Sequence, residues 1–156
     1  MENWIRNIFI TLLVALTLVS CRRNKVDGII ISNDFFMHQS YSENRELRKL
    51  IIQTLGRDEK SLAKLNNFWC GGAAGCYDLG FIITQIIYRL GEQEFIQMVN
   101  RLDDKDIIGL RGLIWAGLEY GDNDGDGKMD DKRIEDEFPD LNTLLETKAK
   151  NYNATH

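Results

Sequence analysis

The chain has 156 residues, of which 44% are hydrophobic and 28% are charged, and its formal net charge is −5. This length suits one compact domain, and the high apolar content with a single proline excludes an intrinsically disordered chain. A net negative charge without a basic stripe also argues against nucleic acid, so no nucleic-acid partner is expected.

An apolar run follows the first charged residues of the chain. Residues 8–16 are almost all apolar, Arg6 precedes them, and Leu18-Val19-Ser20-Cys21 follows them. The run is shorter than the about 20 residues of a membrane span, but it suits the core of a signal peptide. The four residues that end in Cys21 resemble the lipobox of bacterial lipoproteins. This resemblance implies that a signal peptide, residues 1–20, is removed and that the Cys21 thiol carries a lipid.

An uncleaved N-terminal anchor helix is the alternative to that interpretation. Both place the protein at a membrane of the bacterial cell envelope, facing away from the cytoplasm, so the membrane is an expected partner. Residues 21–28 are short, polar and basic, and we predict a lipidated tether there. The next residues, Ile29–Ile31, fit either a short strand or an apolar segment laid over the core.

Helical periodicity dominates the rest of residues 29–150, which we predict to be one all-α domain. The expected architecture is a compact bundle of about six or seven short helices. Residues 76–90 are apolar nearly all round, which is typical of a helix in the middle of a bundle. The tail 151–156 has little to bury and is predicted to fray. The predicted helices run from Ser42 as N-cap to about Leu55, from Asp58 to Trp69, over 76–90, 92–102 and 103–119, over 131–137, and from Pro139 to 150.

Two cysteines remain if Cys21 carries lipid, namely Cys70 and Cys76. Export would place them in an oxidising compartment, and the glycine-rich segment between them can bend enough for the thiols to meet. We therefore predict a disulfide that stabilises the fold by about 2–3 kcal/mol. Two buried thiols are the alternative. Redox catalysis is not expected, because the spacing is not Cys-x-x-Cys.

An acidic stretch near the C-terminus is the most informative part of the sequence. Asp122, Asp124, Asp126 and Asp130 lie within nine residues, interrupted by glycines. Their carboxylates would repel one another, and a hard divalent cation such as Ca²⁺, which prefers oxygen ligands, would remove that repulsion. Between residues 119 and 140 there are ten acidic and three basic residues, so the negative charge of the chain is concentrated at one end.

This stretch, with helices predicted on both sides, resembles the calcium loop of the EF-hand family, here residues 122–133. The resemblance implies a Ca²⁺ site with Gly127 at the sharp turn and Met129 packed against the domain. The metal ligands that it implies are the side chains of Asp122, Asp124 and Asp126, the backbone carbonyl of Lys128, and Asp130 acting through water.

The loop departs from the EF-hand pattern at its twelfth position, where Arg133 replaces the expected glutamate. A cation is not a ligand, so water or a nearby acid, Asp131, Glu135 or Asp136, must complete the coordination. A site without its bidentate carboxylate should be weak, with a dissociation constant of about 10⁻⁴–10⁻³ M. Magnesium and a solvated acidic turn that binds no metal are the alternatives.

Recognised catalytic motifs are missing from the sequence, whose histidines are His38 and His156, so we do not expect an enzyme. Trp69 and Trp115 are expected in the core. The predicted function is that of a lipid-anchored, exported, calcium-binding helical protein, a non-catalytic binding or scaffold module with a structural metal site. The alternatives are an exported inhibitor or immunity-type protein that binds a partner enzyme near the membrane, and an enzyme with unrecognised carboxylate chemistry.

Overall fold

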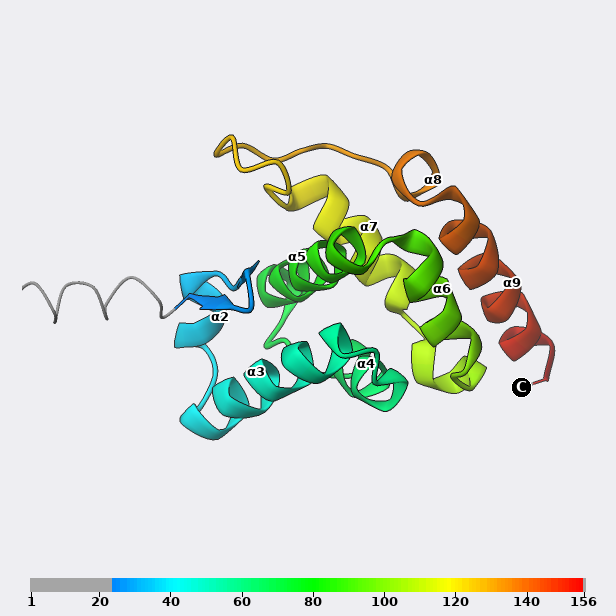
Figure 1. Cartoon of the computed structure of the whole chain (residues 1–156), viewed down its shortest axis with the longest axis horizontal. Helices are drawn as coiled ribbons and strands as arrows, with labels where there is room; N and C mark the ends of the chain where they lie inside the picture. The colour runs from blue at the N-terminus through cyan, green and yellow to red at the C-terminus, as the bar shows by residue number, and fades with distance from the viewer. Residues whose placement is uncertain (1–23, 156) are drawn as a thin grey trace, which may run out of the picture.

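One apolar helix, α5 (Ala73–Leu90), lies at the centre of the computed structural model, which describes residues 24–155 (Figure 1). Its buried side chains include Leu79, Ile82, Ile83, Ile86 and Ile87. The prediction that this helix occupies the middle of the bundle is therefore confirmed. The predicted signal peptide 1–20 and the predicted lipid attachment at Cys21 lie outside the described residues.

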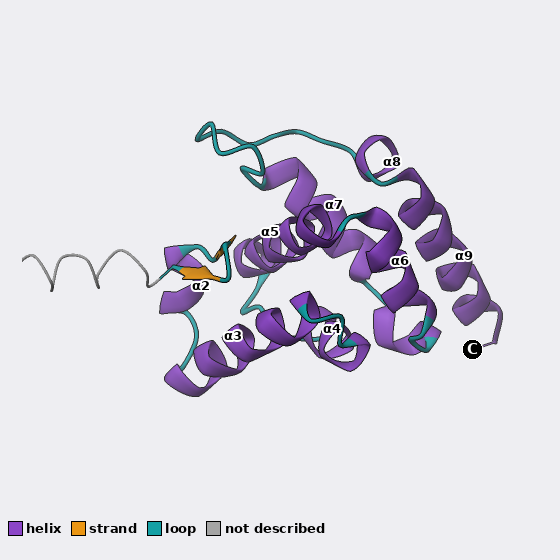
Figure 2. Cartoon of the chain, viewed as in Figure 1, coloured by secondary structure: helices purple, strands orange, loops and turns teal. Residues whose placement is uncertain are grey.

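Several of the other helices pack directly against α5 and the rest pack on these, and helix is by far the main secondary structure (Figure 2). The all-α prediction is thus confirmed. Within residues 24–155, no helix combines the length and the apolar character needed to cross a membrane. The surrounding helices are α2 (Asn33–Met37), α3 (Tyr41–Leu55), α4 (Glu59–Asn66), α6 (Glu92–Asn100), the 3₁₀ helix η1 (Asp104–Ile107), α7 (Leu110–Tyr120), α8 (Ile134–Glu137) and α9 (Pro139–Thr155).

A small hairpin precedes the helices. Strands β1 (Lys25–Val26) and β2 (Ile29–Ile30) pair antiparallel, and the turn between them, Asp27-Gly28, has positive φ at both residues. Asp-Gly is a strong signal for such a hairpin turn, and Val26 is buried. Residues 25–28, predicted as part of the tether over 21–28, therefore belong to this hairpin, and the isoleucine segment begins as a strand.

The helices α5 and α7 approach each other so closely that their backbones touch. A Cβ added to Gly80 would lie 2.1 Å from the Leu113 carbonyl oxygen, and one added to Gly117 would lie 2.3 Å from the Gly80 carbonyl carbon. Only glycine fits at such contacts. The close packing fixes the end of α7, and hence the start of the acidic segment, beside the central helix.

Helix α3 begins two residues earlier than predicted. Its N-cap is Ser40 rather than Ser42. The Ser40 hydroxyl accepts a hydrogen bond from the Glu43 N–H (3.3 Å), and the Ser40 N–H donates to Glu43 Oε2 (2.7 Å), which forms a capping box. Hydrogen bonds from Ser40, chiefly from its side chain, hold the pKa of Glu43 below its usual value.

Three predicted helical boundaries in the second half of the chain also differ. The predicted helix 103–119 is divided, because Gly109 has a φ of 85° and separates η1 from α7. The predicted helix 131–137 begins only at Ile134, after Asp131 at positive φ. Residues 151–155, predicted to fray, continue α9 instead.

The two tryptophans of the described chain are not core residues. Helix α4 ends at Asn66, whose side-chain amide donates hydrogen bonds to the carbonyl oxygens of Asp106 (3.1 Å) and Ile108 (3.0 Å). The chain therefore leaves the helix before Trp69, which is 62% exposed. Trp115 on α7 is 44% exposed. Both contradict the expectation of burial: Trp69 lies beyond the end of α4, and Trp115 is not among the buried residues of α7.

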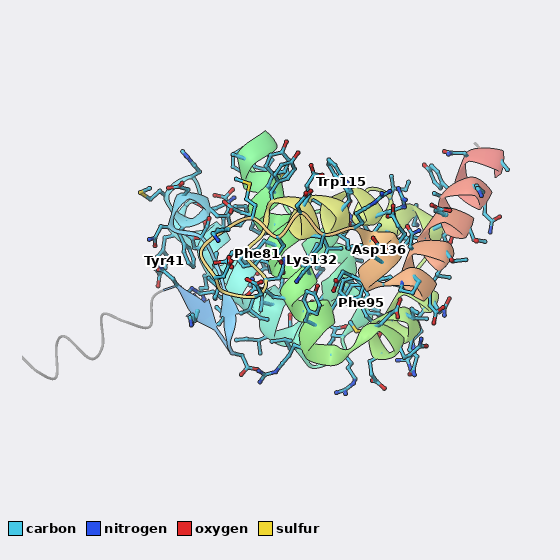
Figure 3. The ribbon with its side chains drawn as sticks, turned by 90° about the horizontal axis from the view of Figure 1, so that it is seen from above. Tyr41, Phe81, Phe95, Trp115, Lys132 and Asp136 are labelled. Carbon is cyan, nitrogen blue, oxygen red and sulfur yellow. A yellow bond between two sulfur atoms is a disulfide. The ribbon has the colours of Figure 1, made fainter. Side chains whose placement is uncertain are left out.

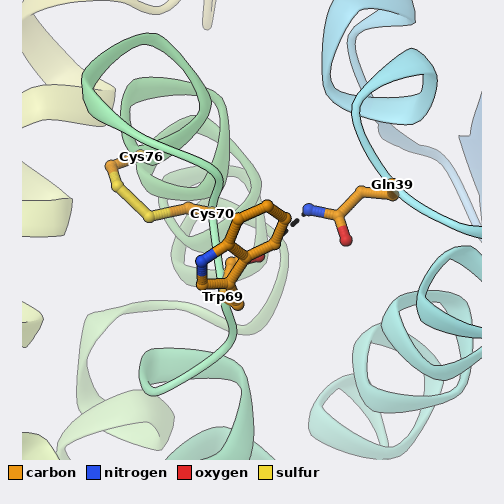
Figure 4. The surroundings of a disulfide bond; sticks show 4 residues. All are labelled: Gln39, Trp69, Cys70 and Cys76. Atoms are coloured by element: carbon orange, nitrogen blue, oxygen red, sulfur yellow. Dashed lines mark hydrogen bonds between the residues drawn. A yellow bond between two sulfur atoms is a disulfide. The ribbon is translucent and has the colours of Figure 1, made fainter.

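The cysteine pair lies at the start of α5 (Figure 4). The Cα atoms of Cys70 and Cys76 are 5.0 Å apart, within the range of a disulfide, so the predicted pairing of these two residues is confirmed. Next to the pair, the Gln39 side-chain amide donates a hydrogen bond to the Trp69 carbonyl oxygen (3.0 Å). The disulfide thus closes the segment that leads into the central helix, which begins at Ala73 rather than at the predicted Cys76.

Candidate metal centre

The acidic loop leaves the C-terminal end of α7 and returns to the same end. On the return, three backbone N–H groups donate to carbonyl oxygens there: Asp130 to Gly121 (2.9 Å), Asp131 to Glu119 (3.2 Å) and Lys132 to Leu118 (3.1 Å). The last carbonyl groups of a helix lack partners within it. The returning chain supplies these partners, so the loop caps α7 with its own backbone.

Asn123 anchors the loop to the bundle. Its side-chain amide donates to the Gly117 carbonyl oxygen (3.0 Å), and its Oδ1 accepts a hydrogen bond from the hydroxyl of Thr84 (2.9 Å). Thr84 lies on α5 and is fully buried. The backbone N–H of Asn123 also donates to Asp130 Oδ2 (3.0 Å). One residue therefore connects α5, α7 and a carboxylate of the loop.

Three carboxylates of the loop converge. Asp122, Asp124 and Asp130 each offer one oxygen, and these oxygens lie within 4.8 Å of one another. Asp122 Oδ2 accepts a hydrogen bond from the Gly127 N–H (3.0 Å). Its other oxygen, Oδ1, is buried and has no hydrogen-bond partner among the described residues. A buried carboxylate oxygen without a partner is costly, and a bound cation would remove that cost.

The Asp130 side chain is almost fully buried, with only 2% of it exposed. Its Oδ2 lies 3.3 Å from Lys132 Nζ, whose side chain is 30% exposed. The ammonium group also lies 5.7 Å from the centre of the Tyr88 ring on α5. Figure 3 labels Lys132 over the central helices. A positive charge from the chain itself thus balances part of the negative charge of the cluster.

Tyr88 extends this contact to α8. Its hydroxyl donates a hydrogen bond to Glu137 Oε2 (2.6 Å). Burial, followed by this bond and the nearby negative charge, raises the pKa of Tyr88, so the phenol keeps its proton and acts as a donor. The exit from the acidic loop is therefore connected to both α5 and α8.

The remaining predicted ligands lie outside the group of three. The Asp126 Oδ1 atom accepts a hydrogen bond from the Lys128 N–H (2.8 Å), and the Asp126 N–H donates to Asp124 Oδ1 (3.0 Å). These are local Asx turns that shape the loop. Gly125 and Gly127 both have positive φ, as the turns require.

One expectation from the EF-hand pattern fails at the end of the loop. Met129 is 69% exposed and does not pack against the domain. The side chain of Arg133 is 70% exposed and pairs with the Glu135 carboxylate. Asp136 lies on α8, away from the loop (Figure 3). Of the acids considered for completing the coordination, Asp131, Glu135 and Asp136 all lie outside the group of three.

Sequence reasoning missed the supporting residues Asn123, Thr84 and Lys132. Thr84 carried a usable signal, since a hydroxyl among isoleucines on a buried helix needs a hydrogen-bond partner. That partner could not be named from the sequence, because Asn123 lies 39 positions away. The Lys132 contact likewise depends on how the loop folds back over α5.

The geometry suits a hard cation bound by oxygen ligands. Ca²⁺ binds oxygens at about 2.3–2.6 Å, so two ligands on opposite sides of one ion are separated by about 4.6–5.2 Å. Oxygens within 4.8 Å of one another can therefore share one ion. Three carboxylates would supply part of the six to eight oxygens that Ca²⁺ takes, and backbone carbonyls and water would supply the rest.

Comparison with protein-family models, with curated proteins and with solved structures gave no match for this chain.

Proposed function

We propose that the acidic loop binds Ca²⁺ through Asp122, Asp124 and Asp130, and that the ion is structural. The observation that carries this proposal is the convergence of three carboxylate oxygens, together with the partnerless, buried Asp122 Oδ1. Without a cation, these charges repel one another at short range.

The ion would act as a clamp between helices. The loop is connected to α7 by its backbone, to α5 by the bond between Asn123 and Thr84, and to α8 by the chain that follows Lys132. Bound metal would hold the two ends of the loop together and so stabilise this side of the bundle. Sensor EF-hands act in pairs that open a groove when Ca²⁺ binds, and a single loop cannot do this. We therefore propose a constant structural role rather than a sensor.

The wider proposal is that the protein is an exported, lipid-anchored and non-catalytic binding or scaffold module. The lipobox-like sequence that ends in Cys21 supports the anchor, and the pairing of Cys70 with Cys76 suits an oxidising compartment outside the cytoplasm.

Thermal unfolding of the full chain in detergent, with EDTA or with 10 mM Ca²⁺, tests the metal site. For a dissociation constant of about 10⁻⁴–10⁻³ M, the ion should stabilise the fold by about 1.5–3 kcal/mol and raise the melting temperature by several degrees. The variant Asp130→Asn should lose most of this increase. The matched control is Asp136→Asn, an exposed acid outside the group, which should keep it.

An equal melting temperature with and without Ca²⁺, and no heat of binding in a calorimetric titration, would contradict the proposal. The loop would then be an acidic turn without a metal. A larger response to Mg²⁺ than to Ca²⁺ would keep the site but change the ion.

A further inference from the structure

Three exposed aromatic side chains form a continuous cluster on the outer surface of α5 and α7. The Tyr120 ring stacks on Tyr77, with ring centres 4.5 Å apart, and meets Trp115 edge-on, with ring centres 6.0 Å apart. Exposure is 40% for Tyr77, 44% for Trp115 and 36% for Tyr120. Figure 3 shows Trp115 at the surface of the bundle. Single exposed aromatic residues are common, but three in mutual contact are typical of recognition surfaces.

This aromatic cluster is rigid. Tyr77 directly follows Cys76, whose disulfide with Cys70 fixes the first part of α5. The backbone contact between α5 and α7 at Gly80 and Gly117 fixes the distance between the two helices. The rings are therefore already in place before any ligand binds, which reduces the entropy cost of recognition.

Two acidic residues lie beside Tyr120, at one end of the cluster. The pKa of the Tyr120 hydroxyl is raised, first by its hydrogen bond to the Glu119 carboxylate and further by burial and by negative charges that include Asp131. Both acids belong to the segment 119–140, in which acidic residues outnumber basic ones by ten to three. A cationic ligand would meet both the negative faces of the rings and these carboxylates.

We propose that the aromatic cluster is the docking surface for a basic segment of a protein partner, and that an arginine side chain of that segment binds against Trp115. A guanidinium group stacks on aromatic faces and pairs with carboxylates through the same planar group, so it suits both features. Anionic lipid would be repelled by the same charges, and a neutral sugar would make no use of them. The inference rests on the proposed binding role of the protein, but it does not require Ca²⁺.

Calorimetric titration of the full chain with the blocked peptide Ac-Arg₄-NH₂ tests the inference. The titration is done in EDTA and low salt, so that its result is independent of the metal site. We expect saturable binding that Trp115→Ala weakens about tenfold and Trp115→Phe largely preserves. Glu119→Gln should weaken binding about twofold and reduce its dependence on salt. The control is Trp69→Ala, which removes an exposed tryptophan from another place and should leave binding unchanged.

Several outcomes would overturn the inference. They are no binding at millimolar peptide, equal binding by the Trp115→Ala variant, and tighter binding of a tetraglutamate peptide. Binding of maltohexaose or of anionic phospholipid vesicles that depends on Trp115 would assign the surface to another ligand class and would also overturn it.

A melting temperature that rises with Ca²⁺ while the arginine peptide fails to bind would refute this inference alone. Peptide binding without a calcium response would refute only the metal proposal.

Discussion

The ion pair between Asp130 and Lys132 neutralises one of the negative charges of the loop. The Asp130 carboxylate is almost fully buried and lies 3.3 Å from the Lys132 ammonium group. A buried carboxylate needs a positive or hydrogen-bonding partner, and it has both in Lys132 and the Asn123 N–H. An ion bound beside Asp130 would therefore be repelled by a lysine that already neutralises the same acid.

We predict that Lys132→Met increases the Ca²⁺ affinity of the loop about two- to fivefold, because it removes a like charge close to the ion. The same change should destabilise the calcium-free protein, since Asp130 loses its partner. Calcium titration followed by calorimetry measures the first effect, and chemical unfolding in EDTA measures the second. Lys150→Met on the exposed end of α9 is the control. A lower affinity for calcium in Lys132→Met would mean that the lysine shapes the loop rather than competing with the ion.

At the scale of the helices, the contact between α5 and α7 places the strictest limit on side-chain size. Two glycines meet where the helices cross, and their missing side chains allow backbone contact. The sequence indicated two apolar helices but not this contact, because a helical glycine is equally compatible with an open surface. Gly112 on α7 shows the difference, since a Cβ there would have nothing within 4 Å.

We therefore predict opposite effects for two similar substitutions on α7. Gly117→Ala should destabilise the protein by about 3 kcal/mol or more, because the added carbon would lie 2.3 Å from Gly80. Gly112→Ala should stabilise it by about 0.5–1 kcal/mol, because alanine favours helix and meets no obstacle. Unfolding by urea measures both. A small effect of Gly117→Ala would show that the two helices can separate without loss.

Periodicity located the long helices well and their ends less well. The apolar run over 76–90 predicted the central helix, whereas the short helix α2 escaped notice because five residues carry too little periodicity. Gly109 divided a predicted helix, because a glycine within a helical pattern does not reveal whether its φ is positive. The cap at Ser40 was visible, because Glu43 follows three residues later, but it was read two positions too late.

At the scale of the whole molecule, the spacing of acids indicated the candidate metal site but not which of the aspartates come together. One failure is local: the Asp130 side chain is almost fully buried, whereas the preceding Met129 is 69% exposed. The contact between Asn123 and Thr84 required the folded arrangement of α5 and α7. Local sequence therefore predicted the loop, and tertiary packing determined which of its oxygens meet.

The disulfide should stabilise the whole fold by about 2 kcal/mol, because it closes a short loop at the start of the central helix. We expect the double variant Cys70→Ser/Cys76→Ser to unfold at a correspondingly lower urea concentration. The comparison is with the unchanged protein in dithiothreitol, which should behave like the variant. If dithiothreitol lowers the stability of the variant as well, the effect does not come from this bond.

The backbone bonds between residues 130–132 and the end of α7 have one more consequence. The chain returns to the end of the helix from which it departed, so residues 124–129, beyond the anchoring Asn123, form a surface loop whose two ends are already held together by hydrogen bonds. Loops of other sequences could be inserted between these two ends, and the polypeptide could be opened near Gly125 to create new termini, without changing the position of any helix. The helical part of the protein would then act as a scaffold for loops of different sequence.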